Sequence, residues 1–241
     1  MNLVILYILC FFAIMVSLLT GYFVSRKAQG CLEELANFEN EKAIVSKEFS
    51  NIVIKNNKLK NLAILPLRAK KTNYYCAKYN VIKLSPNTLY SGKLIDLAIS
   101  ARCLNQAKRQ QTFYISSTLW SLTLAISKFF MLAFLPTVLI SAILNITFGL
   151  KTIAYFSTLV ALICFCIAFL IHFIYYFIDN ATNKQTLIDI SETSIFNEHE
   201  ITALYIILHS ISQQEFFRIS RLSLKFASLI NPAHYAEPED I

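Results

Sequence analysis

Residues 94–109, LIDLAISARCLNQAKR, have the apolar spacing of an α-helix. Intervals of three and four residues separate the apolar side chains of Leu94, Leu97, Ala98, Ala101 and Leu104. Side chains at such intervals share one face of a helix. We therefore expect a helix over residues 91–109 that buries this face. The same stretch contains three polar residues in close succession, Arg102, Cys103 and Gln106.

The composition around this stretch is that of a membrane protein. Of the 241 residues, 56% are hydrophobic and 15% are charged, whereas soluble domains carry about 25% charged residues. Residues 25–117 hold sixteen Lys and Arg against six Asp and Glu, and residues 179–241 hold four against nine. A basic segment between apolar spans is typical of a loop that stays in the cytoplasm. This distribution argues against nucleic acid as a partner.

Three apolar segments, residues 3–24, 129–149 and 153–178, are long enough to cross a bilayer. A span of the hydrocarbon core, about 30 Å thick, takes about 20 helical residues. The first segment is followed, not preceded, by Arg26 and Lys27, so we interpret it as an uncleaved anchor and not as a signal peptide. Only residues 150–152 separate the other two segments, which predicts a helical hairpin.

These spans divide the chain into four parts. We expect an anchor over residues 1–24, a basic unit over 25–117, a hairpin over 118–178 and a helical tail over 179–241. Three crossings place both polar parts on one side, and the positive-inside bias makes that side the cytoplasm. The sequence therefore predicts an integral protein of the plasma (inner) membrane with its N-terminus outside. The lipid bilayer is then its first partner.

Short elements are predicted within the polar parts. Residues 28–50 have helical spacing, and residues 51–55 and 61–67 are expected to form short strands or a passage from helix to strand. The clearest strand is YNVIKLS at 79–85, which is ended by Ser85, Pro86 and Asn87. Either Ser85 or Asn87 is expected to cap the helix that follows.

The tail is predicted to be helical as well. Residues 179–182 are expected to cap a helix that begins at Asn183. A second, apolar helix is expected over residues 198–212. Its apolar core is too short to span a bilayer, so it should pack on the polar unit or lie at the membrane interface.

This order of parts resembles the membrane neutral zinc metallopeptidases of bacteria. That family carries D-H-Y-D-P-R-x-x-x-V-R-L-S ahead of a helix with A-x-H-E-x-G-H-A. Residues 73–85, NYYCAKYNVIKLS, are similar to the first motif, and NATNKQ at 180–185 is similar to a later N-A-S-R-R-A. The resemblance implies a mostly α membrane protein. It would have three transmembrane helices and a small cytoplasmic α+β, zincin-like unit inserted between the first and second.

The chain departs from the family at the helix that should bind zinc. On the register of the resemblance, the first zinc histidine falls on Arg102, the general-base glutamate on Cys103 and the second histidine on Gln106. Positions i and i+4 share a helix face, which lets two imidazoles bind one zinc. A guanidinium has no lone pair to offer a metal. The resemblance therefore implies a family member whose zinc ligands and general base are replaced.

Other candidate groups are weaker. The family's third, acidic ligand falls on Ile178, with Asp179 beside it. His199 and Glu200 begin an H-E pair, but position 203 is alanine and the second histidine is missing. His172 lies inside the third apolar segment, where ionisable groups are often functional. Cys103 is conceivable as a nucleophile beside one of the histidines. No disulfide framework is expected, because three of the six cysteines lie within apolar spans and the other three lie in the part that we place in the reducing cytoplasm.

The sequence thus favours a catalytically degenerate family member that acts as a binding or regulatory module. We expect no enzymatic activity and no cofactor, with zinc only if the family activity is retained. An extended peptide or a membrane protein is the expected partner, and the sequence leaves the oligomeric state open. Strand residues Val81, Ile82, Lys83, Leu84 and Ser85 would pair with such a peptide by β-augmentation. The alternatives are an active zinc-dependent membrane endopeptidase with displaced ligands, and an unrelated small membrane scaffold.

Overall fold

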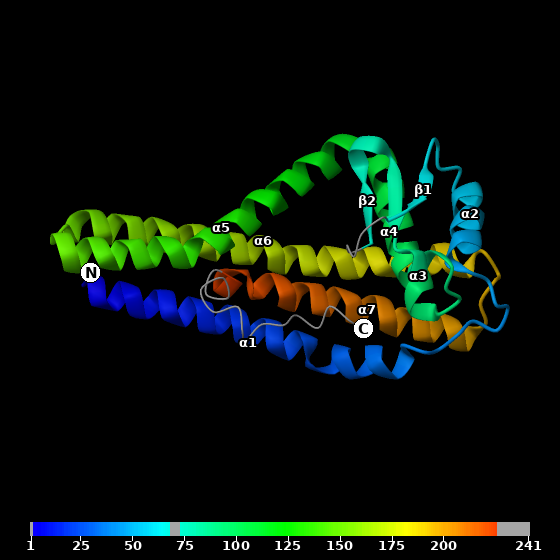
Figure 1. Ribbon diagram of the computed structural model, residues 1–241, viewed down its shortest axis with the longest axis horizontal. Coiled ribbons are helices and arrows are strands. Elements are labelled where there is room, and N and C mark those ends of the chain that lie inside the picture. Colours follow the sequence, from blue (N-terminus) through cyan, green and yellow to red (C-terminus); the bar gives the residue numbers. More distant parts are fainter. Residues whose placement is uncertain (1, 68–72, 226–241) are drawn as a thin grey trace. The chain divides into compact units, whose positions relative to one another are not determined.

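The computed structural model describes residues 2–67 and 73–225, and its fold is mostly helical with one small sheet, as the sequence predicts. Figure 1 labels the elements along the chain. The helices are α1 (Leu3–Leu35), α2 (Ser46–Asn56), α3 (Pro86–Leu89), α4 (Leu94–Thr112), α5 (Tyr114–Phe148), α6 (Lys151–Ser191) and α7 (Glu198–Ser220). The strands are β1 (Ala63–Pro66), β2 (Tyr74–Cys76) and β3 (Val81–Leu84), and Ala77–Tyr79 and Leu222–Leu224 form short 3₁₀ turns.

Helices α1, α5 and α6 are each long and apolar enough to cross a membrane. Each is longer than its apolar segment: α1 continues through Arg26 and Lys27 to Leu35, and α6 continues past Ile178 to Ser191. The predicted new helix at Asn183 is therefore wrong. No glycine or proline interrupts residues 178–191. The side chains of Asp179 and Asn183 bond to residues on other helices, so they do not cap a helix end here.

The turn between α5 and α6 confirms the predicted hairpin. Gly149 has a φ of +65°, a left-handed conformation that glycine adopts without the steric cost of a Cβ atom. The backbone N–H of Leu150 donates to the carbonyl oxygen of Leu144 at 3.2 Å. Two residues are thus enough to reverse the chain between the two long helices.

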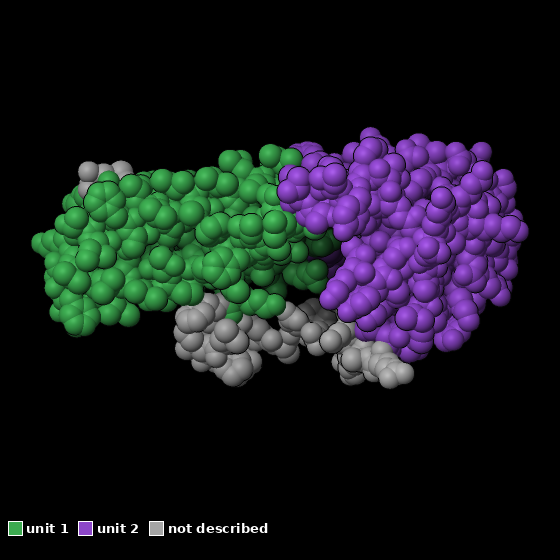
Figure 2. All heavy atoms as spheres, turned by 90° about the horizontal axis from the view of Figure 1, so that it is seen from above, with its two compact units in different colours: residues 1–25, 121–176, 215–241 green, residues 26–120, 177–214 purple. Residues whose placement is uncertain are grey.

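The chain forms two compact units (Figure 2). The first comprises residues 1–25, 121–176 and 215–241, and the second comprises residues 26–120 and 177–214. Within the first unit, Phe134 of α5 stacks on Phe165 of α6, with ring centroids 4.4 Å apart. Cys10 of α1 and Ile219 of α7 belong to the same buried cluster. Four helices therefore share one apolar core in this unit.

The second unit is built around the three-stranded sheet, whose order is β1-β3-β2. Strand β3 pairs in parallel with β1 and antiparallel with β2. Its residues Ile82 and Leu84 are buried in a cluster that also contains Phe49 of α2, Leu97 of α4 and Leu204 of α7. The apolar face predicted for α4 is confirmed, because Leu94, Leu97, Ala98, Ala101 and Leu104 are all buried.

Local signals account for some of these elements and miss others. Ser85 caps α3 as expected, since its Oγ accepts the N–H of Thr88 at 3.1 Å. Residues 61–67 supply β1, but residues 51–55 lie in α2 and do not form a strand. The buried side chains of α2 are Ser46, Phe49, Ser50 and Val53. Their spacing of three and four residues is helical, and it continues past residue 50, where the sequence analysis expects helical spacing to end.

Two glycines of α1 allow a matched test of helix packing. A Cβ atom on Gly21 would lie 2.8 Å from Ser220 Cβ of α7, whereas one on Gly30 would meet nothing within 4 Å. Small residues let membrane helices approach closely. We expect Gly21→Ala to lower the thermal unfolding midpoint of the detergent-solubilised chain, with a loss of about 1–3 kcal/mol from overpacking. Gly30→Ala should leave the midpoint unchanged or raise it, because alanine favours a helix by up to about 1 kcal/mol. Equal shifts for both variants would contradict this packing.

Candidate functional site

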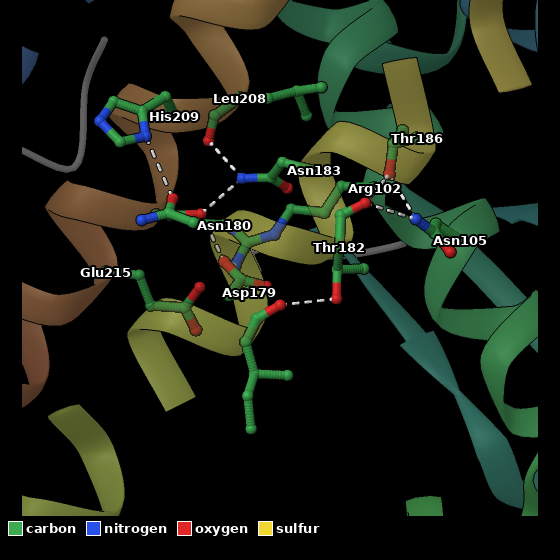
Figure 3. A network of polar contacts seen from close by, with 12 residues as sticks. Arg102, Asn105, Asp179, Asn180, Thr182, Asn183, Thr186, Leu208, His209 and Glu215 are labelled. Carbon is green, nitrogen blue, oxygen red and sulfur yellow. Dashed lines mark hydrogen bonds and ion pairs between the residues drawn. The ribbon is translucent and has the colours of Figure 1, made fainter. Parts of the chain in front are cut away.

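Arg102 of α4 forms a buried ion pair with the candidate residue Asp179 of α6. Arg102 Nη2 donates to Asp179 Oδ2 at 2.7 Å, and the two side chains are 13% and 8% exposed. Figure 3 shows the Arg102 side chain reaching from α4 to α6. Two candidates that lie 77 positions apart in the sequence are therefore direct partners. A charge pair this well covered depends on both members, because removing either one leaves the other charge uncompensated.

Asp179 is also held from α7. The Ser212 hydroxyl donates to Asp179 Oδ2, and Asn183 Nδ2 donates to Ser212 Oγ at 2.9 Å. Asn183 Nδ2 also donates to the carbonyl oxygen of Leu208 at 3.1 Å. The carboxylate of α6 is thus joined to α4 by the guanidinium and to α7 by a hydroxyl. We call Arg102, Asp179, Asn183 and Ser212 the polar layer.

The same face of α4 makes further polar contacts with α6. Asn105 Nδ2 donates to the carbonyl oxygen of Thr182 and to the hydroxyl oxygen of Thr186. Arg109 Nη1 donates to Thr182 Oγ1 at 2.9 Å. Positions 102, 105 and 109 follow the helical repeat, so one stripe of α4 faces α6. Gln106 is not part of this stripe and is exposed.

Asn105, Asn183 and Ser212 were not identified from the sequence. The signal for Asn183 was present, because Asp179, Asn183 and Thr186 recur at helical spacing. The structure buries all three. A search for apolar periodicity overlooks a stripe of this kind, because its members are polar. Ser212 is found only from its hydrogen bonds to Asp179 and Asn183 of α6.

Cys103 points into the core of the second unit. It is 5% exposed and belongs to the apolar cluster around Leu97 and Leu104. Burial raises the pKa of the Cys103 thiol to about 12, and the positive charge of Arg102 only partly opposes this rise. Since thiolates and not thiols are nucleophiles, Cys103 stays protonated and unreactive near neutral pH. The same burial makes position 103 unsuited to a general-base carboxylate.

Glu200 serves the start of α7. Its carboxylate accepts the backbone N–H of Asn197 at 2.9 Å, and Asn197 Oδ1 accepts the N–H of Glu200 at 2.8 Å. This reciprocal arrangement is a capping box. Glu200 also accepts the N–H of Glu41 at 2.8 Å. His199 is exposed, and its ring centroid lies 5.6 Å from that of Phe38. The H-E pair therefore marks a helix N-terminus.

These residues do not fit a zinc ion. Among residues 2–67 and 73–225, no three His, Cys, Asp or Glu side chains gather closely enough to hold a metal. Helix α4 contains no histidine at any position, so no register along it supplies the two imidazoles of the family motif. The resemblance places its acidic zinc ligand next to Asp179. The Asp179 carboxylate already binds the guanidinium of Arg102.

The strand candidates occupy the middle of the sheet. Both hydrogen-bonding edges of β3 are paired, with β1 on one side and β2 on the other. The expectation that Val81, Ile82, Lys83 and Leu84 pair with an extended peptide is therefore wrong, because β-augmentation needs an open edge. Ser85 is engaged as the cap of α3. Strands β1 and β2 form the two edges of this sheet.

His172 belongs to the first unit, whereas the residues of the polar layer belong to the second. It is 1% exposed, and its Nε2 lies 3.0 Å from Ser127 Oγ. Ser127 already donates its hydroxyl hydrogen to the carbonyl oxygen of Leu124. Nε2 is therefore the donor to Ser127, and the neutral tautomer leaves Nδ1 as an acceptor, with no partner among the described residues. This contact pins α5 to α6.

Comparison with known proteins returned one protein family. The profile of the family described as "Putative neutral zinc metallopeptidase" matches residues 7–212. No curated protein matches the chain, and no solved structure does. The matched range includes α1 from residue 7 onward, all of α5 and α6, the sheet, α4 and the polar layer.

The polar layer predicts the effect of removing one charge. Arg102→Met should leave the Asp179 carboxylate buried without its guanidinium, at a cost of about 3–5 kcal/mol. The double variant Arg102→Met with Asp179→Asn should regain most of that loss, because no unpaired charge remains. Thermal unfolding of the solubilised chain measures both. Arg218→Met is the control: Arg218 lies 3.9 Å from Glu215 and is 64% exposed, so its loss should cost at most about 1 kcal/mol. A double variant no more stable than Arg102→Met would contradict the pairing.

Cys103 predicts a pattern of thiol labelling. We expect iodoacetamide at neutral pH to modify the half-buried Cys31 and Cys76 in the folded chain and to leave Cys103 unmodified. Denaturant should make all three thiols reactive. Peptide mass spectrometry reads each site separately. Faster labelling of Cys103 than of Cys76 in the folded chain would instead identify an activated nucleophile.

Proposed function

Because the chain belongs to the family described as "Putative neutral zinc metallopeptidase", we propose that it is a catalytically degenerate member of that family. It is integral to the membrane and acts as a binding or regulatory module. Family membership excludes the unrelated scaffold that the sequence alone left open. Activity is a property of the site and not of the fold, so the argument rests on the polar layer.

The ion pair between Arg102 and Asp179 carries the proposal. In the resemblance, Arg102 stands at a zinc ligand and Asp179 lies next to another. In the structure the two are 2.7 Å apart. A permanent cation on α4 neutralises the carboxylate that a metal would need. The guanidinium cannot give up its proton to become a ligand at physiological pH. We propose that this internal cation replaces the metal as the link between α4 and α6.

The alternative of an active peptidase with displaced ligands has less support. Its candidates were Asp179, His199 and Glu200. Asp179 is bonded to Arg102 and Ser212, and both oxygens of the Glu200 carboxylate accept backbone N–H groups. A water activated by metal would also need a general base, and position 103 is a buried, protonated thiol.

Membrane insertion is supported by the three long apolar helices. We propose the plasma membrane, with the N-terminus outside and the second unit in the cytoplasm, because sixteen of the 22 Lys and Arg fall within residues 25–117. An extended peptide or a membrane protein is the proposed partner. Such a peptide would have to add to β1 or β2, since β3 has no open edge.

Zinc content tests this function. We expect the full chain, purified from zinc-supplemented cells, to hold far less than stoichiometric zinc and to leave casein uncleaved, because α4 offers no imidazole. Elemental analysis per chain and a casein assay are the measurements. One zinc per chain that is lost in Asp179→Asn or Glu200→Gln, with casein cleavage lost alongside it, would establish a displaced active site and overturn the proposal. Glu198→Gln, an exposed neighbour in the first turn of α7, is the matched control.

A further inference from the structure

We propose that the outer face of the three-stranded sheet binds the headgroups of anionic phospholipids. The inference rests on the proposed membrane insertion. Strand pairing places Leu65, Lys83 and Tyr74 in one row, and Ala63, Val81 and Cys76 in the next. Directly paired residues point to the same side of a sheet. We call these six residues the basic sheet face.

The two sides of the sheet differ sharply in burial. On the inner side, Ile82 is 1% exposed and Leu84 is fully buried, against the cluster that contains α4. On the basic sheet face, Leu65 is 47% exposed and Tyr74 is 37% exposed. Tyr79, in the turn before β3, is 65% exposed. Val81, Lys83 and Cys76 are half-buried, so Leu65 and Tyr74 supply the exposed apolar and aromatic contact surface of this face.

The segment of the chain that contains the sheet carries charge of one sign. Residues 49–95 contain no Asp or Glu and nine Lys and Arg, three of which, Arg68, Lys70 and Lys71, lie outside the described residues. The other six are Lys55, Lys58, Lys60, Lys78, Lys83 and Lys93. None of these six takes part in an ion pair between described residues. The segment therefore presents a positive field with no internal acid to neutralise it.

Two lysines lie against tyrosine rings, one on the basic sheet face and one in the 3₁₀ turn between β2 and β3. Lys83 Nζ lies 5.8 Å from the centroid of the Tyr74 ring, and Lys78 Nζ lies 5.3 Å from that of Tyr79. Tyrosine prefers the boundary between hydrocarbon and water, and lysine extends its amine from apolar surface toward headgroups. Leu65 adds an apolar contact beside them. A surface with charged, aromatic and apolar side chains fits the headgroup region of a bilayer better than it fits a polyanion dissolved in water.

Chain connectivity favours lipid over a soluble acidic partner. The basic segment lies in the sequence between α1 and α5, both of which are apolar enough to span a membrane. Tethering of this kind keeps a surface at high local concentration. Anionic lipids give that surface a negative potential, which attracts polybasic segments close to the membrane.

Lysine labelling in nanodiscs tests the assignment. The full chain is inserted into discs of phosphatidylcholine, or of phosphatidylcholine with about 30% phosphatidylglycerol, as the anionic surface. Acetylation of each lysine is followed by mass spectrometry. We expect Lys78 and Lys83 to react about threefold more slowly in the anionic discs. The difference should vanish near about 1 M salt, where the screening length falls to about 3 Å. Lys47, which is exposed on α2, is the internal control.

Two charge reversals sharpen the test. Lys83→Glu should abolish the protection of Lys78, whereas Lys47→Glu should leave it intact.

Equal labelling of the wild-type chain in both kinds of disc overturns the inference, whatever the variants do. Protection in neutral discs by an added acidic peptide or RNA, without an effect of phosphatidylglycerol, assigns the face to that macromolecule and also overturns it. A chain that does not enter discs at all contradicts the proposed membrane function itself. A chain that enters them and shows no protection contradicts only this inference.

Discussion

The ion pair between Arg102 and Asp179 is the contact on which the second unit depends most. Removing two charges from water is costly, and their mutual attraction offsets that cost only where geometry is close and the remaining polar atoms are bonded. Here the 2.7 Å contact is backed by Ser212, and Asn183 holds Ser212 in turn. Because these residues belong to α4, α6 and α7, their satisfaction fixes which faces of three helices meet. The apolar cluster of this unit stabilises the packing of the helices but does not depend on their exact orientation. The polar layer sets that orientation.

If the chain is the degenerate family member that we propose, this arrangement explains how the helices would stay joined without a metal. A zinc site joins its helices through coordination bonds, and its loss leaves a carboxylate that needs a new cation. Arg102 supplies that cation from within the chain. The surrounding elements that the family resemblance includes remain in place: β3 packs with α4 in one core, and Ser85 ends the strand by capping α3. Under the proposed function, these elements keep their places while the groups for hydrolysis have been replaced.

Local patterns in the sequence predict much of this fold, and contacts between distant residues decide the rest. The long apolar helices, the hairpin at Gly149 and the buried face of α4 follow from composition and spacing, because each is set by neighbours along the chain. The central position of β3 does not, since it depends on pairing with two strands whose order no local signal encodes. Asp179 shows the same limit. Its residue type favours a helix cap, but Arg102 and Ser212 satisfy it inside a continuous helix. For the site, Arg102 and Asp179 were both candidates from the sequence, whereas their pairing with each other could not be predicted from it.

The capping box at the start of α7 has a consequence for how short motifs are recognised. A histidine followed by glutamate is the first half of a zinc signature, and an asparagine three residues before a glutamate is a helix-start signature. In NEHE, residues 197–200, the two overlap on Glu200. A carboxylate engaged by two backbone N–H groups is already occupied, so the overlap is a false positive for metal binding. A motif search among divergent relatives of metalloenzymes should therefore first exclude residues that form helix-start signatures. The remaining ligand motifs would then mark retained metal sites and not chance matches.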